Sequence, residues 1–256
     1  MLTAATIKHL NQLQQKKYRA EFKEFIVEGV KGVKEAIESD AEIIIIIIDG
    51  KLRDEPEFLE LVKMASAHEI AFDFCSRADI GEIKTTDTFP GVLAVVSSAD
   101  IGLDEIARGT IIALDGLKDP GNLGTIIRTA DWFGVSRLIL GEDTVDPYNP
   151  KVVRSTMGSI FRVDIFESVD LAHSLDWLKK KYGYRVIALT MDGAPLPPSI
   201  DYRTADKIIL LFGSESHGIS PKLEKIIDSR YTIRGNSQAE SLNVAVAAGI
   251  TLSRIK

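Results

Sequence analysis

The sequence of 256 residues has little cysteine and histidine and no long apolar segment, and each shortage excludes a class of protein. The single cysteine, Cys75, rules out an internal disulfide, so we expect a reducing compartment. The four histidines are scattered without metal-ligand spacing, so no structural metal is expected. The isoleucine run at 43–48 is far shorter than the roughly 20 residues of a membrane helix, and the first residues do not resemble a secretory signal. These absences predict a soluble cytoplasmic protein.

The chain also lacks a basic balance, since 37 acidic residues outnumber 31 lysines and arginines and the formal net charge is -6. An acidic balance argues mildly against a nucleic-acid-binding protein, but net charge constrains solubility and steering more than it constrains a local site. The first 20 residues nevertheless contain no acid and four basic residues, namely Lys8, Lys16, Lys17 and Arg19. This basic segment is either a solvated helix face or an RNA-contacting one, and charge alone leaves both interpretations open.

The first hundred residues alternate helical and strand patterns. We predict helices at 6–23, 26–37 and 56–67 and strands at 43–48, 70–74 and 92–96. The six isoleucines at 43–48 are too uniformly apolar for an amphipathic helix, which favours a central strand buried on both faces. Serine, aspartate and glycine then interrupt the pattern, as is typical of a linker. The predicted division is a first domain at 1–98, a linker at 99–108 and a second domain at 109–256.

The second domain has short apolar strands that are mostly separated by helical stretches. We predict strands at 111–114, 138–140, 186–189, 208–212 and 231–233. This rhythm indicates an α/β fold with a mostly parallel sheet covered by helices. The chain turns to Gly, Asp, Asn, Ser or Thr after these strands. Because the ends of parallel strands share one edge of a sheet, these turns predict one polar, glycine-lined cleft.

The first candidate segment, residues 115–134, is a glycine-rich loop followed by a predicted helix. Gly116 and Gly121 have the spacing of a phosphate-binding P-loop. However, Asn122 and Leu123 stand where that motif requires Lys and then Ser or Thr, so the NTPase interpretation fails.

Arg128 lies about one helical turn beyond that loop, at the mouth of the predicted cleft. It shares a helix face with Asp131 at i, i+3 spacing. The pattern alone favours a surface arginine paired with that aspartate over a functional one.

The second candidate segment, residues 211–221, is a strand followed by an acidic turn between two glycines. Gly213 and Gly218 either let the main chain approach a ligand closely or simply adopt positive φ. Glu215 between them either accepts a hydrogen bond in the cleft or lies in solvent. The residues alone leave both pairs of alternatives open.

The third candidate segment, residues 233–250, contains a run of small residues that predicts a tightly packed helix. Ser241 is well placed to cap that helix. Asn243 lies in its first turn, where a buried side-chain amide needs partners. Capping would satisfy Asn243 without any catalytic role, so both roles remain open.

Together these segments resemble the three motifs of the SpoU/TrmH branch of the SPOUT RNA methyltransferases. The first is similar to the family pattern N-x-G-x-x-x-R-T-A, the second to G-x-E-x-x-G and the third to S-L-N-V. Residues 150–159 resemble the family's helix between the first two motifs. Residues 25–29 and 91–96 resemble the start and end of a substrate-binding domain related to ribosomal protein L30e. The resemblance therefore covers nearly the whole chain.

The resemblance implies a SPOUT domain with a C-terminal trefoil knot, preceded by a smaller L30e-like α/β domain. It also implies transfer of a methyl group from S-adenosyl-L-methionine (SAM) to a ribose 2'-hydroxyl. The implied cofactor contacts are Gly213, Ile233, Leu242, Thr190 and Gly218. The implied catalytic residues are Arg128, Asn122, Glu215, Ser241 and Asn243. The family assigns activation of the hydroxyl to the arginine, but a guanidinium stays protonated, so orienting the hydroxyl and an adjacent phosphate is physically easier.

The resemblance further implies a homodimer, with the C-terminal helix at its interface, and a ribosomal or transfer RNA substrate. The expected RNA contacts are Lys151, Arg154, Lys16, Lys17 and Arg19. Three alternatives compete with this interpretation. A non-catalytic RNA-binding protein is opposed by the complete set of motif residues, and a small-molecule methyltransferase by the L30e-like domain. A base-modifying enzyme is opposed by Arg128.

Overall fold

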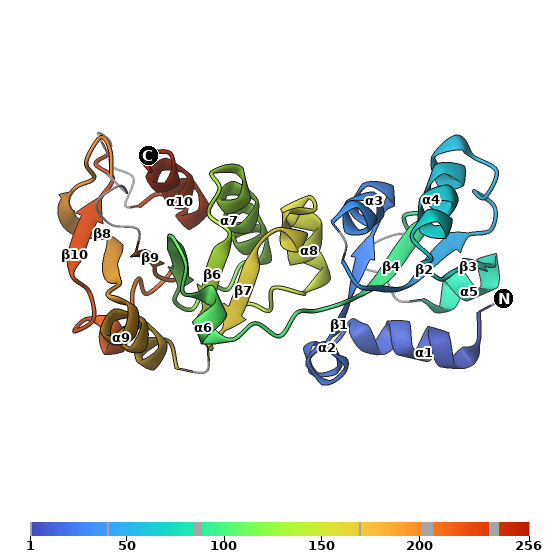
Figure 1. Cartoon of the computed structure of the whole chain (residues 1–256), viewed down its shortest axis with the longest axis horizontal. Coiled ribbons are helices and arrows are strands. Elements are labelled where there is room, and N and C mark those ends of the chain that lie inside the picture. Colours follow the sequence, from blue (N-terminus) through green and yellow to red (C-terminus); the bar gives the residue numbers. More distant parts are fainter. Residues whose placement is uncertain are drawn as a thin grey trace. The chain divides into compact units, whose positions relative to one another are not determined.

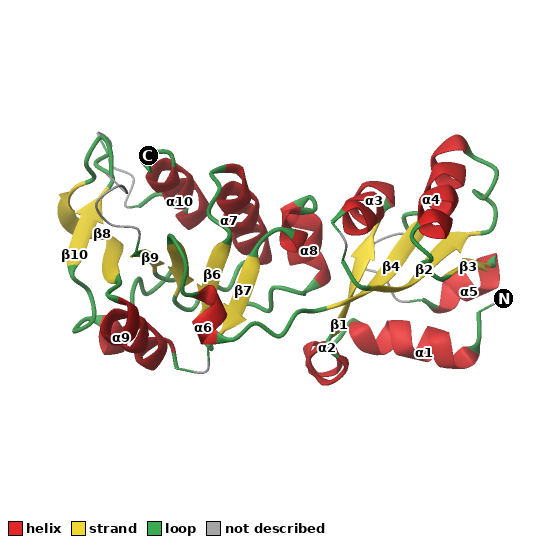
Figure 2. Cartoon of the chain, in the orientation of Figure 1, coloured by secondary structure: helices red, strands yellow, loops and turns green. Residues whose placement is uncertain are grey.

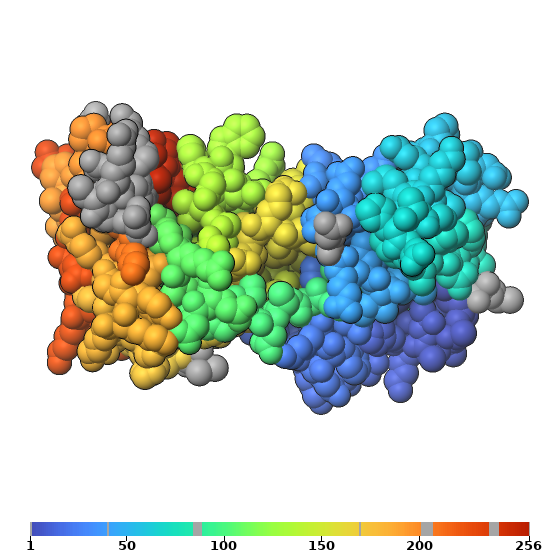
Figure 3. Space-filling view, viewed as in Figure 1, coloured from blue at the N-terminus to red at the C-terminus, as the bar shows by residue number. Residues whose placement is uncertain are grey.

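The computed structural model describes residues 2–39, 41–83, 89–168, 170–200, 207–235 and 241–255. The chain forms two compact units, the first made of Met1–Ala99 with Asp146–Phe161 and the second of Asp100–Val145 with Arg162–Lys256. The elements of each unit are labelled in Figure 1 and coloured by type in Figure 2. Figure 3 gives the space-filling view from the same side. We predicted that all of 109–256 would form the second domain, but residues 146–161 pack in the first. The sequence of a short helix does not indicate which sheet the helix will pack against.

The first unit is built on a four-stranded sheet with the order β1-β4-β2-β3. Its strands are β1 Glu24–Glu28, β2 Ile43–Asp49, β3 Phe72–Cys75 and β4 Val92–Ser97. Its helices are α1 Ala4–Leu13, α2 Lys16–Phe22, α3 Val30–Glu38, α4 Pro56–Ala67, α5 Arg77–Glu82, α8 Pro150–Thr156 and the 3-10 turn η1 Ser159–Phe161. Strand β4 is antiparallel to β1 and β2, whereas β3 is parallel to β2. The isoleucine strand is central, as predicted, although Ile44 is exposed.

Two predicted helices in this unit are wrong. The helix expected at 6–23 is divided, because Gln15 adopts an extended conformation between α1 and α2. The helix expected at 26–37 begins as strand β1, whose three central residues are buried and pair with β4. Gly29, with φ of 88°, then turns the chain into α3. A short apolar run has too few residues for periodicity to separate strand from helix, and its pairing with a distant strand decides the outcome.

Arg19 forms a buried ion pair inside the first unit. Its Nε donates to Asp146 Oδ2 at 2.8 Å, and its Nη1 donates to the main-chain oxygen of Leu13 at 2.8 Å. The side chain of Arg19 is only 5% exposed. The expectation that Arg19 contacts RNA is therefore wrong, because its donors already hold the segment that begins at Asp146.

Arg19→Ala is expected to lower the free energy of unfolding by about 3 kcal/mol, because it leaves the Asp146 carboxylate buried without its partner. Urea denaturation followed by circular dichroism measures this loss. Lys16→Ala, at an exposed position of the same helix, is the control and should change stability by less than about 0.5 kcal/mol. Equal stabilities of the two variants would contradict the role given to the ion pair.

The second unit is built on a six-stranded sheet with the order β10-β8-β9-β5-β6-β7, and every pairing in it is parallel. Its strands are β5 Ile111–Leu114, β6 Arg137–Leu140, β7 Asp164–Glu167, β8 Arg185–Pro195, β9 Ile208–Phe212 and β10 Ser229–Thr232. Its helices are α6 Leu103–Ile106, α7 Pro120–Trp132, α9 Leu171–Tyr182, α10 Val244–Leu252 and the 3-10 turn η2 Pro221–Leu223. The predicted parallel α/β fold is confirmed. Strand β7, at the sheet edge, was not predicted.

Part of the predicted linker belongs to the second unit. Helix α6 lies within residues 99–108, and Ile106 is fully buried in the core beneath β5 and α9. Its amphipathic pattern covers only one turn, which is too short to distinguish from a loop. In the described part of the chain, no helix has the length and apolarity needed to cross a membrane.

Candidate active site

The three candidate segments follow β5, β9 and β10 of the parallel sheet. Because all six strands run in the same direction, the ends of these strands lie at one edge. Strands β10, β8 and β9 are neighbours, and β5 lies beside β9. The topology therefore brings together segments that are about a hundred residues apart in the sequence.

Helix α7 presents the polar residues of the first motif. The Asp119 carboxylate caps the helix by accepting a hydrogen bond from the Asn122 main-chain nitrogen at 2.7 Å, and Pro120 occupies the first turn. The buried stripe of the helix is Leu123, Gly124, Ile126, Ile127 and Ala130. With that stripe against the sheet, Asn122 is half-buried and Arg128 is exposed.

A chain of hydrogen bonds joins all three motifs. Asn122 Nδ2 donates to Glu215 Oε1 at 2.9 Å, and Asn243 Nδ2 donates to Asn122 Oδ1 at 2.9 Å. Asn243 Oδ1 in turn accepts hydrogen bonds from the main-chain nitrogens of Ala245 and Val246, at 2.9 and 3.3 Å. Capping and a role in the site are thus compatible for Asn243, because its side-chain oxygen caps α10 and its side-chain nitrogen binds Asn122.

Asn243, not Ser241, is the N-cap of the last helix. Helix α10 begins at Val244, so the residue before it supplies the capping oxygen, and the predicted capping role of Ser241 is wrong. Ser241 and Leu242 are exposed ahead of the helix. In the part of the chain that the structure describes, the Ser241 hydroxyl makes no hydrogen bond.

The main chain of the second motif forms a closed loop. The nitrogen of Ser214 donates to the oxygen of Gly218 at 2.9 Å, and the nitrogen of Gly218 donates back to Ser214 at 3.1 Å. A Cβ at Gly213 would lie 2.1 Å from the carbonyl carbon of Gly218, and Gly218 has φ of 66°. The loop's own backbone therefore requires both glycines, one for close approach and one for positive φ.

Arg128 is not paired with Asp131. The Asp131 carboxylate instead accepts a hydrogen bond from Arg162 Nε at 2.9 Å. Within the described residues, the Arg128 guanidinium has no hydrogen bond or ion pair, so the interpretation as a structural surface pair is wrong. The guanidinium is free to bind an anionic or hydroxyl-bearing ligand.

The residues expected to contact SAM lie around the ends of β8, β9 and β10. Thr190 is in β8, Gly213 and Gly218 bracket the loop after β9, and Ile233 follows β10. Leu242 precedes α10, with half of its surface exposed. No described atom lies within 4 Å of a Cβ built at Gly218, so the main chain there is open to a ligand. Exposed apolar side chains and open backbone suit a nucleoside cofactor.

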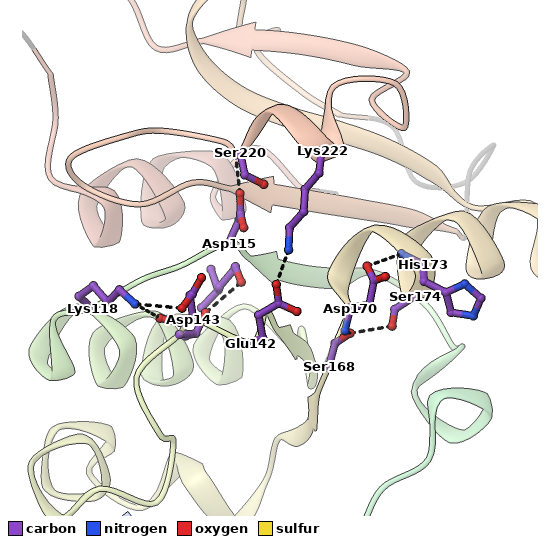
Figure 4. A network of polar contacts seen from close by, with 12 residues as sticks. Asp115, Lys118, Glu142, Asp143, Ser168, Asp170, His173, Ser174, Ser220 and Lys222 are labelled. Carbon is purple, nitrogen blue, oxygen red and sulfur yellow. Dashed lines mark hydrogen bonds and ion pairs between the residues drawn. The ribbon is translucent and has the colours of Figure 1, made fainter.

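A polar network lies at the ends of β5, β6 and β7, beside the second motif (Figure 4). Lys222 forms an ion pair with Glu142, and this hydrogen bond raises the pKa of Lys222 above its ordinary value. Lys118 Nζ donates to the main-chain oxygen of Asp143 at 2.6 Å. Asp115 accepts a hydrogen bond from the Ser220 nitrogen at 2.6 Å. No role was predicted for Asp115, although an aspartate directly after a buried strand was a usable signal.

The four remaining RNA-contact candidates all belong to the first compact unit. Lys16 and Lys17 are exposed on α2, and Lys151 is exposed on α8. Arg154 is also exposed on α8, and its Nη2 donates to Glu28 at 3.0 Å. The three lysines are therefore accessible, whereas Arg154 already has a carboxylate partner. No group of His, Cys, Asp and Glu in the described residues has a metal-binding arrangement.

Comparisons with known proteins identify both units. Residues 109–253 match the model of the SpoU rRNA Methylase family, and residues 4–94 match the MRM3-like substrate binding domain. The 23S rRNA (guanosine(2553)-2'-O)-methyltransferase RlmP of Bacillus subtilis is 30% identical over 98% of this chain and 95% of its own. The 23S rRNA (guanosine-2'-O-)-methyltransferase RlmB of Acinetobacter baylyi is 26% identical over 88% of this chain and 93% of its own.

Two solved structures with bound cofactor are similar along nearly their whole length. The AdoMet-bound rRNA methyltransferase from Sinorhizobium meliloti has a TM-score of 0.84 and 31% identity, covering 99% of this chain and 95% of that one. The SpoU methyltransferase AviRb from Streptomyces viridochromogenes, in complex with AdoMet, has a TM-score of 0.87 and 25% identity, covering 98% and 97%. The similarity therefore extends over both units.

Proposed function

The chain belongs to the SpoU rRNA methylase family, and from this we propose that it transfers a methyl group from SAM to a ribose 2'-hydroxyl of ribosomal or transfer RNA. The observation that carries the proposal is the hydrogen-bonded chain of Glu215, Asn122 and Asn243. It joins one residue from each family motif at the edge of the sheet.

Arg128 orients the acceptor in this proposal. Its guanidinium is exposed on α7, the helix whose first turn contains Asn122, so it can donate hydrogen bonds to the 2'-hydroxyl and to a neighbouring phosphate. It remains protonated at neutral pH, which suits orientation better than proton removal. The Glu215 carboxylate and the Asn243 amide fix the orientation of Asn122, and the exposed Ser241 hydroxyl completes the set.

SAM supplies an electrophilic methyl group on its sulfonium. Gly213, Gly218 and Ile233 would hold it through their main chains, and Leu242 would cover an apolar face of it, with Thr190 beside them. The exposed Leu242 and the open space beside Gly218 support this assignment. We include the trefoil knot of the C-terminal segment in the proposal, because the fold matches SpoU structures closely.

The first unit is proposed to bind the RNA substrate as an L30e-like domain. The match of residues 4–94 to a substrate-binding domain supports this role. Lys16, Lys17 and Lys151 are exposed cations that can contact phosphates, and Arg154 contributes if it exchanges Glu28 for a phosphate.

A homodimer is part of the proposal, with α10 and the adjacent α7 at the interface. These helices lie side by side, and Thr129 packs near Gly249 (Figure 1). Trp132 on α7 is 84% exposed and Val246 on α10 is half exposed, so each helix offers an apolar side chain to a partner. A second copy of the chain would cover this surface.

The function is tested by incubating the purified protein with labelled SAM and unmodified ribosomal or transfer RNA. The RNA is then digested to nucleosides, which are separated by chromatography and identified by tandem mass spectrometry. The proposal predicts label in 2'-O-methyl nucleosides. Label found only on bases would contradict a ribose acceptor, and no label in any RNA would favour the non-catalytic RNA-binding alternative.

A further inference from the structure

The loop that carries Glu215 is closed at its base by a residue outside the second motif. Asp115, directly after β5, donates its main-chain nitrogen to the oxygen of Phe212 at 2.9 Å, where the loop begins. Its carboxylate Oδ2 accepts a hydrogen bond from the nitrogen of Ser220 at 2.6 Å, where the loop ends. One residue therefore binds both ends of the loop.

Ile219 packs against the core at the end of the loop, whereas the tip that carries Glu215 has little packing to hold it in place. Residues 215–218 are exposed, and the two hydrogen bonds between Ser214 and Gly218 only close the loop on itself. Among the described residues, its hydrogen bonds to the rest of the unit are those with Asp115 and the bond from Asn122 to Glu215. The position of Glu215 thus depends strongly on the base of the loop.

Asp115 is also the first residue of the loop that leads to Asn122. Gly116 follows it with φ of 72°, and a Cβ built there would lie 3.8 Å from the Cβ of Ser214. The first two motif loops therefore depart from the same point of the sheet. Both partners of the bond between Asn122 and Glu215 are positioned from Asp115.

The Asp115 carboxylate is well suited to this task. It is 9% exposed, and a hydrogen bond from a main-chain nitrogen to a carboxylate is stronger than one between neutral groups. Figure 4 shows it below Ser220, with Lys222 to one side and Glu142 below. Removing the carboxylate would leave the Ser220 nitrogen without its acceptor.

We propose that Asp115 is a positioning residue of the methyltransferase site, which holds the loop at 213–219 so that Glu215 meets Asn122. This inference rests on the proposed function, but its structural part can be measured without activity. Asp115 does not touch the reacting atoms in this scheme. It acts through Glu215 and through the loop expected to bind SAM.

The test compares Asp115→Ala with Asp115→Asn, which keeps an oxygen acceptor of the same shape. Loss of one buried hydrogen bond to a charged group predicts at least about tenfold lower kcat for Asp115→Ala, with the KM for RNA unchanged. Asp115→Asn should recover most of that loss. Ser174→Ala, which removes a buried hydrogen bond to Ser168 in the same unit, is the control and should keep wild-type kcat.

Hydrogen exchange of the free protein provides the second measurement. In Asp115→Ala, amides in a peptide covering 213–220 should exchange at least about tenfold faster than in wild type, while the rest of the sheet is unchanged. Asp115→Asn should lie between the two. Unchanged exchange in this peptide, or a kcat no lower than that of the control, overturns the positioning role. If Asp115→Ala does not fold, Asp115→Ser takes its place. The positioning role is then overturned if both Asp115→Ser and Asp115→Asn show wild-type exchange and wild-type kcat. If the wild-type protein methylates no RNA, the proposed function is contradicted instead.

Discussion

Arg128→Ala is expected to lower kcat for RNA methylation by about a hundredfold or more, because a charged donor positioned at the reacting oxygen is lost. The dissociation constant for SAM should stay unchanged, since Arg128 lies on α7, and the expected cofactor contacts lie in β8 and in loops beside it. Single-turnover methyl transfer and calorimetric titration with SAM measure the two quantities separately. Arg128→Lys should remain impaired, because an ammonium cannot bind two oxygens in the planar manner of a guanidinium.

Arg185→Ala is the matched control for this experiment. Arg185 is an exposed arginine at the first residue of β8, so it lies at the sheet edge opposite the candidate site. Its removal should leave both kcat and SAM binding as in wild type. Turnover of Arg128→Ala equal to that of this control would remove Arg128 from the mechanism.

Gly213→Ala is expected to abolish measurable SAM binding and methyl transfer. The added Cβ would lie 2.1 Å from the carbonyl carbon of Gly218 and 2.4 Å from the nitrogen of Ile219. Backbone atoms cannot yield as a flexible side chain can, so the loop at 213–219 must open and carry Glu215 away from Asn122. Equilibrium titration with SAM and the methylation assay both measure this loss.

The control for this substitution is Gly81→Ala. Gly81 is helical, and a Cβ built there would meet no described atom within 4 Å. Alanine at this position should leave activity unchanged and should stabilise the helix by about 0.5–1 kcal/mol. SAM binding by Gly213→Ala at wild-type affinity would show that the closed loop is not part of the cofactor site.

The parallel sheet of the second unit was predictable because each of its buried strands is a short apolar run followed by polar turn residues. The first unit was less predictable for a physical reason. Residues 25–27 have the same apolar character whether they form a strand or the start of a helix. Their pairing with β4, some seventy residues later, determines that they form a strand. Strand β7 has only two apolar residues between two acidic ones, so it lacks the apolar run that marked the other strands. Helix α6 has four residues, which is too short for a periodic pattern.

The candidate site was predictable by motif but not by geometry. Resemblance to a family identified Asn122, Glu215 and Asn243, yet the bonds between them join residues 93 and 121 positions apart. No local pattern contains such contacts. The same reason explains Arg19, whose charge predicted an RNA contact, because its buried partner Asp146 is 127 positions away. Asp115 was missed because its two bonds are also made to a distant segment.

The most direct test of the central claim uses RNA from cells that lack this protein. Total RNA from such cells and from wild-type cells is incubated with the protein and methyl-labelled SAM, then hydrolysed in alkali. A 2'-O-methyl group blocks alkaline cleavage at its own nucleotide. We expect labelled, alkali-resistant dinucleotides from the RNA of the deficient cells and almost none from wild-type RNA, whose sites are already methylated. Label released only as alkali-sensitive mononucleotides, or equal labelling of the two RNAs, would contradict it.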